Sequence, residues 1–343
     1  MLKYYLDLGD VEIGAVLTAV PASPAPYFVT TLIGGDTSDQ PYRELTVRNA
    51  LTGAATAVVP SLKDAHWSTV STVSTVSAGS DPWTFLVMSS SAWGSDLDRI
   101  YRLTTNQDGT VRSLNPVESL RNLHPNDFAL SPDGDSLAID TSYTDPDNLT
   151  AGITIMNLRD GRTRILQADQ AGRTDSFSWS ADGRHLAYRL TVIPHGPDAG
   201  SREDGIWVLD LGRAGFDLLA DSHQVTTADL SEFGPADWTL SADGRRLYCI
   251  LGALDGSHSV LTKRVVEIEA ATGRQPRVLR ELHHRFSMVT GWSSDGPLTL
   301  DPSGRWLLAS DAGTDYYRID LSSGAVSRLP TTVNRGHPNE LAW

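Results

Sequence analysis

Acidic side chains fall at similar places in a repeated pattern of this sequence, and they are its first candidates for chemistry. They are Asp64, Asp127, Asp175, Asp237, Asp295 and Glu340. If these carboxylates line the mouth of a central channel, they focus a negative potential that favours a cation, an amine or a metal ion. The alternative is that each carboxylate accepts backbone N–H hydrogen bonds where a strand begins.

Histidines are the second group, because imidazole titrates near neutral pH and ligates metals. The histidines that do not recur in the repeat are the candidates for acid–base catalysis: His195, His223, His283 and His284. The alternative is that they are solvated loop residues. Histidines near carboxylates could hold a divalent metal, but no fixed ligand spacing identifies such a site. The sequence therefore assigns no cofactor firmly and leaves a divalent metal open.

Two tryptophans, Trp93 and Trp292, are expected in loops beside acidic residues. There an indole could pack against a cationic or apolar ligand, or be a half-buried structural side chain. The single cysteine, Cys249, excludes an intrachain disulfide and a thiolate metal cluster. It lies in an apolar run and is expected to be buried and inert.

The elements that must position these residues are predicted from internal repeats. Four hairpin sequences align without gaps: FALSPDGDSLAI (128–139), FSWSADGRHLAY (177–188), WTLSADGRRLYC (238–249) and LTLDPSGRWLLA (298–309). In each, two short apolar strands flank a turn whose glycine is expected at positive φ. Apolar residues recur with helical spacing almost nowhere in the sequence, so the chain is expected to be all-β.

A second repeated unit follows each hairpin and predicts strands c and d of a four-stranded blade. Its copies are 45–59, 100–114, 153–166, 206–219, 265–279 and 317–329. Six copies predict a six-bladed β-propeller of antiparallel blades. The C-terminal ELAW resembles the start of an innermost strand that the first blade lacks, so the last strand is expected to join that blade and close the ring.

The predicted organisation is an N-terminal extension over 1–25 and a single propeller domain over 26–343. The expected blades are 26–60 with 337–343, then 64–116, 125–168, 174–220, 235–281 and 290–330.

The S-P-D-G and S-A-D-G hairpins, which recur across nearly the whole chain, resemble those of the TolB-type and WD-repeat-like bacterial propellers. Arginine strongly outnumbers lysine, which suggests an actinobacterial genome. Members of this group bind proteins or peptides, accompany peptidase domains, or act on small molecules. The resemblance therefore implies an architecture and a binding face rather than a reaction.

In a propeller the b–c and d–a loops emerge on one face, and the long loops of this sequence are expected there. The favoured function is a non-catalytic binding or scaffold module that presents this acidic, histidine-containing face and the channel mouth to a protein, peptide or small molecule. The alternative is an enzyme, a lyase, isomerase, cyclase or hydrolase of specialised metabolism, that uses His and Asp or Glu at the channel mouth.

The net charge and the hydropathy of the chain argue against two kinds of partner, nucleic acid and the membrane interior. The net charge of −14 argues against nucleic acid, which requires a basic face. No run is long and apolar enough for a membrane span. The chain is therefore expected to be cytoplasmic, with an exported or anchored precursor left open.

Overall fold

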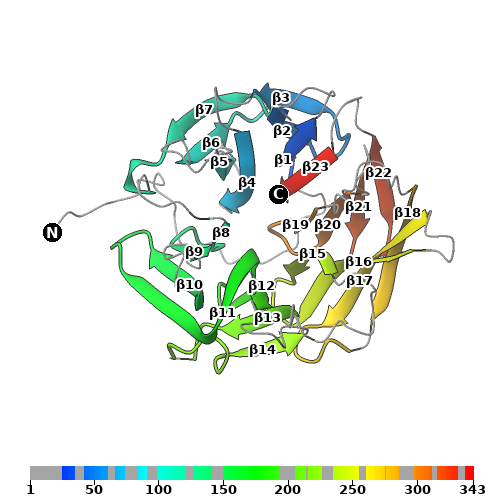
Figure 1. Ribbon diagram of the computed structural model, residues 1–343. Helices are drawn as coiled ribbons and strands as arrows, with labels where there is room; N and C mark the ends of the chain where they lie inside the picture. Colours follow the sequence, from blue (N-terminus) through cyan, green and yellow to red (C-terminus); the bar gives the residue numbers. More distant parts are fainter. Residues whose placement is uncertain are drawn as a thin grey trace.

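The fold consists of antiparallel β-sheets arranged around a common centre, as Figure 1 shows for the computed structural model. The structure describes residues 25–34, 42–60, 66–73, 83–90, 99–120, 125, 127–140, 150–192, 205–213, 215–225, 235–254, 260–274, 276–285, 297–310, 315–330 and 337–343. Apart from one 3-10 turn at Glu118–Leu120, every regular element in these ranges is a strand.

Five sheets contain the strands. The first has the order β23 (His337–Ala342), β1 (Tyr27–Gly34), β2 (Tyr42–Asn49), β3 (Ala55–Val59). The next along the chain comprises β4 (His66–Val73), β5 (Thr84–Ser90), β6 (Arg99–Thr105) and β7 (Val111–Pro116). Two further four-stranded sheets are β15 (Pro235–Leu240), β16 (Arg246–Leu254), β17 (Val260–Glu269), β18 (Arg277–Arg285), and β19 (Leu298–Leu300), β20 (Trp306–Ser310), β21 (Asp315–Asp320), β22 (Val326–Pro330).

The remaining sheet has seven strands and two halves that share one long strand. Its order is β14 (Ser222–Val225), β13 (Gly205–Asp210), β12 (His185–Val192), β11 (Thr163–Trp179), β10 (Thr150–Asn157), β9 (Ser136–Asp140), β8 (Phe128–Leu130). β11 pairs with β10 as far as Ala171 and with β12 from Gly172 onward. The sequence predicted two separate strands here, and this prediction was wrong because the backbone passes from one partner to the next without a break.

A second prediction also needs correction. The run 206–219 was expected to contain strands c and d, but the fourth strand, β14, begins only at Ser222. The intervening segment folds as a turn because Arg164 of β11 donates hydrogen bonds to the carbonyl oxygens of Leu211, Arg213 and Gly215, at 2.8–3.3 Å. The side chain that decides this turn lies some fifty residues away in the chain.

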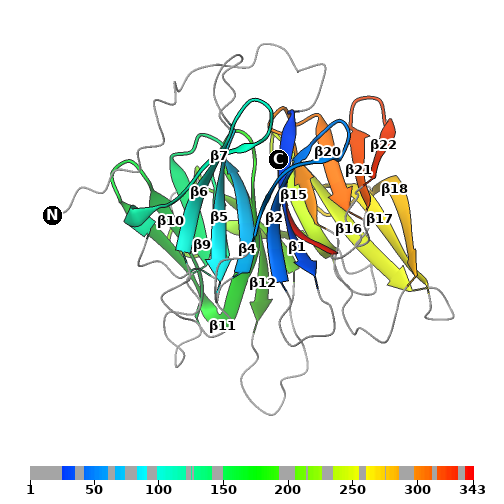
Figure 2. The ribbon, with the colours of Figure 1, turned by 90° about the horizontal axis from the view of Figure 1, so that it is seen from above.

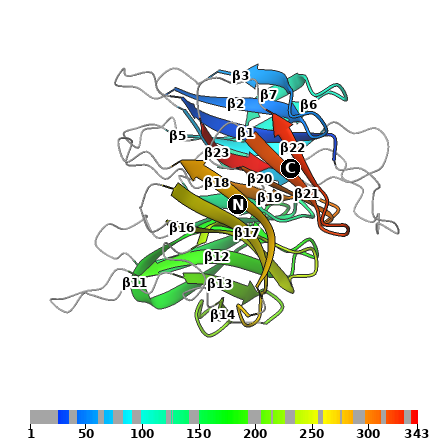
Figure 3. The same ribbon diagram turned by 90° about the vertical axis from the view of Figure 1, so that its right-hand side faces the viewer.

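The inner strands contact one another in cyclic order: β23 with β4, β4 with β8, β8 with β11, β11 with β15, β15 with β19, and β19 with β23. Figure 2 shows the sheets edge-on, with strands running through the thickness of the molecule. Figure 3 shows the stack of β11 to β14 from the side. This arrangement is a propeller-type fold, as the repeats predicted.

The predicted hairpin turns are confirmed. Gly134, Gly183, Gly244 and Gly304 have φ between 66° and 73°. In the first of these turns, Gly134 N donates to Ser131 O at 2.8 Å, and Asp133 accepts from Ser131 Oγ at 2.5 Å. Asp and Ser therefore hold the turn with their own side chains, and glycine supplies the positive φ.

The hydrophobic core lies between neighbouring sheets. One cluster, for example, joins Ile206 and Val208 of β13 to Trp238 of β15 and Cys249 of β16. Since each sheet buries both faces against its neighbours, apolar side chains on alternate faces of a strand belong to different clusters. Burial raises the pKa of the Cys249 thiol to about 12, so the thiol stays protonated at neutral pH.

A glycine is required where β11 stops pairing with β10 and begins to pair with β12. A Cβ added at Gly172 would lie 2.5 Å from the backbone oxygen of Thr191. We expect Gly172→Ala to cost about 1–3 kcal/mol, because the backbone must move to admit the methyl group. Urea denaturation measures this. Gly205→Ala is the matched control, since Gly205 also lies in a strand but a Cβ there would meet only the movable end of the Gln224 side chain, and an equal or larger cost there would contradict the explanation.

Candidate functional site

The predicted site residues divide into those the structure describes and those it does not. Asp64, Asp295, Trp93, Trp292 and His195 lie outside the described residues. Glu340 lies in β23, and His283 and His284 lie in β18, where the backbone is placed but the side chains are not described. Asp127, Asp175, Asp237 and His223 are described with their side chains.

Asp127 and Asp237 each hold two neighbouring inner strands together through hydrogen bonds to one carboxylate. Asp127 accepts the backbone N–H of Phe128 at 2.8 Å and, across the gap between strands, the N–H of Ser176. Asp237 accepts the N–H of Trp238 at 2.8 Å and that of Leu298 in β19 at 2.5 Å. Each carboxylate thus accepts the N–H of the residue that follows it and an N–H of the next inner strand.

Asp175 has a different environment. Counted back from the hairpin serine, the equivalent of Asp127 is Ser176, so Asp175 stands one residue earlier. Its Oδ1 accepts from Arg189 Nε at 2.6 Å and from Ser176 Oγ at 3.0 Å, and Arg173 Nε lies 3.7 Å from Oδ2. On β11 a hydroxyl, not a carboxylate, makes the hydrogen bond to the next inner strand: Ser178 Oγ accepts the N–H of Leu240 in β15 at 3.0 Å.

Together these groups form a polar cluster, the Asp127–Asp175 cluster, which we define as Asp127, Asp175, Arg173, Arg189 and Trp238. Asp127 directly precedes β8, and the other four residues lie in β11, β12 and β15. The Arg189 guanidinium lies 5.9 Å from the centroid of the Trp238 ring, within the range of a cation–π contact.

The electrostatics of the cluster favour proton uptake by one carboxyl group. Burial raises the pKa of Asp127 to about 7, and the charge of Asp175 adds to this effect. The N–H groups of Ser176, Phe128 and Phe177 oppose it by stabilising the carboxylate. Beside it, Ser176 adopts φ 57°, in the left-handed region that costs a non-glycine residue about 1 kcal/mol. A carboxyl group with a pKa near neutrality can exchange a proton at physiological pH.

His223, the candidate histidine whose side chain is described, lies far from this cluster. His223 is in β14, and its Nε2 is 3.0 Å from the carbonyl oxygen of Ala270 in the next sheet. β14 is three strand spacings from β11, which amounts to about 14 Å. His283 and His284 lie in β18, equally far across their sheet from β15 and Asp237. The fold therefore does not bring these backbones to the inner strands.

Sequence reasoning missed Arg173, Arg189 and Ser178. The pairing of Asp175 with Arg189 depends on a register shift between Asp175 and Ser178. Counting outward from the hairpin turn without this shift places Leu190 opposite Asp175. Among the described residues, no group of three or more His, Cys, Asp or Glu side chains could hold a metal ion. None of the described segments forms a helix with the length and hydrophobicity that a membrane span requires.

Comparison with known proteins identifies no family for this chain. No protein-family model matches the chain, and no curated protein matches it. A solved structure of the dihydro-heme d1 dehydrogenase NirN is similar with 14% identity and a TM-score of 0.41, over 94% of this chain and 75% of that one.

Two other solved structures are similar at the same level. The Cps50 (Swd1) β-propeller domain of Myceliophteria thermophila has 11% identity and a TM-score of 0.42, over 92% of each chain. A puromycin-hydrolyzing peptidase of Mycobacterium tuberculosis has 11% identity and a TM-score of 0.43, over 78% of this chain and 53% of that one. With TM-scores this low, the likenesses carry no argument about what this chain binds or does.

Proposed function

We propose that this chain is a six-bladed propeller, closed by its C-terminal strand, that acts as a binding module. In this proposal residues 26–343 form one domain, distantly related to the TolB-type and WD-repeat-like propellers. Two observations support the ring: β23 pairs with β1, and the inner strands contact one another in cyclic order back to β23. The shared strand β11 then supplies the outer strand of one blade and the inner strand of the next.

The binding site is the entry of the inner strands, at the Asp127–Asp175 cluster, and its ligand carries a positively charged group. The observation that carries this proposal is the meeting of two carboxyl groups from adjacent inner strands beside an indole ring, with Asp175 close enough to raise the pKa of Asp127. Arg189 already pairs with Asp175 and lies over the buried Trp238 ring. The Asp175 charge still raises the pKa of Asp127, so a cation that reaches Asp127 would relieve the remaining repulsion between the two carboxylates. An amine of a small molecule or a lysine of a partner peptide has this chemistry.

The test is a thermal-shift panel of spermidine, a lysyl dipeptide and divalent metal ions after treatment with EDTA. We expect a cationic probe to raise the melting temperature of the wild type at pH 8, where Asp127 is ionised. Asp175→Asn should lose most of this shift. Asp160→Asn is the matched control, because it removes the same charge from the exposed turn between β10 and β11 and should leave the shift unchanged. An equal shift in all three proteins, or in none, would contradict the proposal.

A second candidate function is catalysis with Asp127 as general acid and base. The observation in its favour is the pKa of about 7, which suits proton transfer at neutral pH. Incubating a metabolite extract with wild type and with Asp127→Asn, followed by mass spectrometry, tests it. A compound consumed by the wild type alone would favour an enzyme. Identical extracts would leave the binding module as the function.

A further inference from the structure

A fully buried arginine lies between the first sheet and the sheet of β19 to β22. Arg48 of β2 stands five residues before Gly53, the glycine with positive φ in its turn. Gly273 and Gly324 are the corresponding turn glycines of two other sheets. The residues five positions before them are Ile268 and Ile319, which are buried aliphatic residues. Arg48 is equally buried, with 0% of its surface exposed. A charged side chain therefore occupies an aliphatic position of the repeat.

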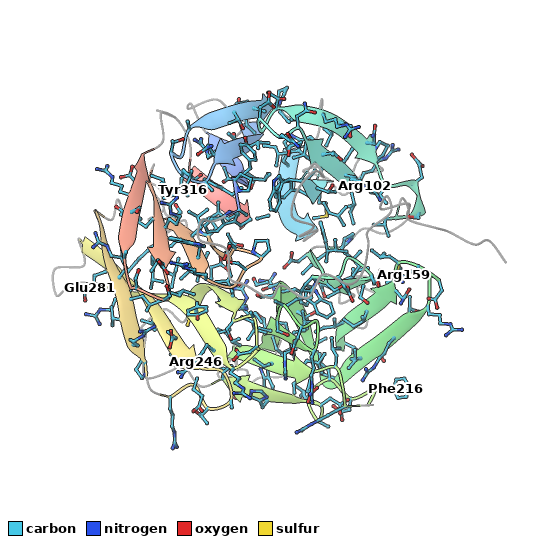
Figure 4. All side chains as sticks on the ribbon, turned by 180° about the vertical axis from the view of Figure 1, so that it is seen from behind. Arg102, Arg159, Phe216, Arg246, Glu281 and Tyr316 are labelled. Carbon is cyan, nitrogen blue, oxygen red and sulfur yellow. The ribbon has the colours of Figure 1, made fainter. Side chains whose placement is uncertain are left out.

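The contacts of Arg48 use only part of its hydrogen-bonding capacity. Nη1 donates to Gly53 O at 2.9 Å, and the guanidinium lies 5.7 Å from the centroid of the Tyr316 ring. Figure 4 labels Tyr316, on β21. The Tyr316 hydroxyl donates to Thr30 Oγ1 at 3.3 Å. Within the described part of the chain, Nε and Nη2 of Arg48 have no hydrogen-bond acceptor.

A second unsatisfied donor lies on the same face of β2. Thr46, two residues before Arg48, is 1% exposed, and its Oγ1 has no hydrogen-bond partner among the described residues. Thr46 pairs with Thr30 in the register of β1 and β2. Across the seam, Arg318 of β21 donates from Nη1 to Ala50 O at 2.5 Å, while its buried Nε also lacks an acceptor in the described ranges.

In the described part of the chain, no carboxylate pairs with the positive charge of Arg48. Burial lowers the pKa of Arg48, and the nearby Tyr316 hydroxyl opposes that effect, but a guanidinium remains protonated at neutral pH. No ion pair between described residues includes Arg48. An unpaired buried charge is strongly destabilising, so a counter-charge is required. The local groups are N–H and O–H donors, which together suit an anion.

We propose that the seam between β2 and β21 binds a small monovalent anion, such as chloride, through Nε and Nη2 of Arg48 and the hydroxyl of Thr46. This site is distinct from the Asp127–Asp175 cluster and independent of the proposed function. Because Arg48 and Thr46 are enclosed only when β2 packs against β21 in the folded molecule, the anion binds the native state and stabilises it by mass action.

The first experiment measures the melting temperature of the full chain during titration with sodium chloride against sodium gluconate at constant ionic strength. Chloride should raise the melting temperature by about 2 °C or more and then saturate, as expected for binding to the native state alone. Arg48→Met should abolish this chloride dependence, and Thr46→Val should weaken it. Arg264→Met is the matched control, because its ion pair with Glu281 is exposed, so it loses the same charge but should keep the dependence.

If Arg48→Met does not fold, bromide binding to wild-type crystals still tests the proposal. Crystals of the wild type in sodium bromide should give an anomalous peak at hydrogen-bond distance from Arg48 and Thr46. A carboxylate oxygen or a water molecule at that position would overturn the proposal. Equal melting temperatures in chloride and gluconate would overturn it as well.

Discussion

Removal of residues 337–343 should destabilise the whole molecule rather than one end of it. These residues form β23, which pairs with β1 through Val29↔Ala342 and Thr30↔Leu341. Trp343 is 1% exposed and packs with Phe28, Tyr316 and Leu329, and its Nε1 donates to Ala25 O at 3.1 Å. The loss removes an inner strand that contacts both β4 and β19.

The expected magnitude follows from Trp343, the most buried of the described side chains in this segment. Replacement of a buried tryptophan by alanine costs about 3–5 kcal/mol, and typical domains are stable by only about 5–15 kcal/mol. We therefore expect Trp343→Ala to lower the free energy of unfolding by this amount, and the truncated chain to lose cooperative unfolding. Guanidinium denaturation followed by tryptophan fluorescence measures both.

Trp343→Phe is the conservative control, since it retains an aromatic ring but loses the hydrogen bond to Ala25 O. It should cost less than Trp343→Ala. A truncated chain that unfolds with the midpoint and cooperativity of the wild type would show that β23 does not hold the ring.

The stability of the protein should fall as pH rises from about 4 to about 7. Burial raises the pKa of Asp127 to about 7 in the folded chain, and the Asp175 charge contributes to the rise, whereas an aspartate in the unfolded chain has a pKa of about 3.9. Between these values the folded state binds more protons than the unfolded state. The contribution of Asp127 is therefore fully present below pH 4 and is lost as pH passes through 7.

The upper limit of this effect is about 4 kcal/mol, since each pKa unit corresponds to about 1.4 kcal/mol. Denaturation midpoints at intervals between pH 4 and 8 measure it. Asp127→Asn should flatten the dependence across this window, although the variant also loses one backbone acceptor at every pH.

Asp237→Asn is a matched control, because Asp237 makes the same two backbone hydrogen bonds, to Trp238 and Leu298. It should be destabilised at all pH values, which measures the cost of the lost backbone acceptor by itself. If Asp127→Asn keeps the slope of the wild type, the titrating group is a different one.

The proposed site illustrates what local sequence leaves undecided. Asp175 was expected to be equivalent to Asp127 and Asp237, because all three stand shortly before an inner strand. Its real equivalent is Ser176, and the register shift beside Ser176 turns Asp175 toward Arg189. A shift of one residue exchanges the faces of a strand, and short-range residue preferences do not encode it here.

By itself the sequence determined the elements whose geometry is local. The hairpin turns and their glycines follow from four or five consecutive residues, since Ser, Asp and Gly meet the needs of the turn with their own atoms. Their recurrence, and the likeness of ELAW to an inner strand, predicted a propeller and the pairing partner of β1.

Only the tertiary structure decided which partners the polar side chains take. Contacts between distant segments decide four features: the union of two predicted strands in β11, the turn held by Arg164, the links from Asp127 and Asp237 to the next inner strand, and the burial of Arg48. Such contacts depend on how the sheets pack, because hydrogen bonding and burial are properties of the folded molecule and not of any single stretch of chain.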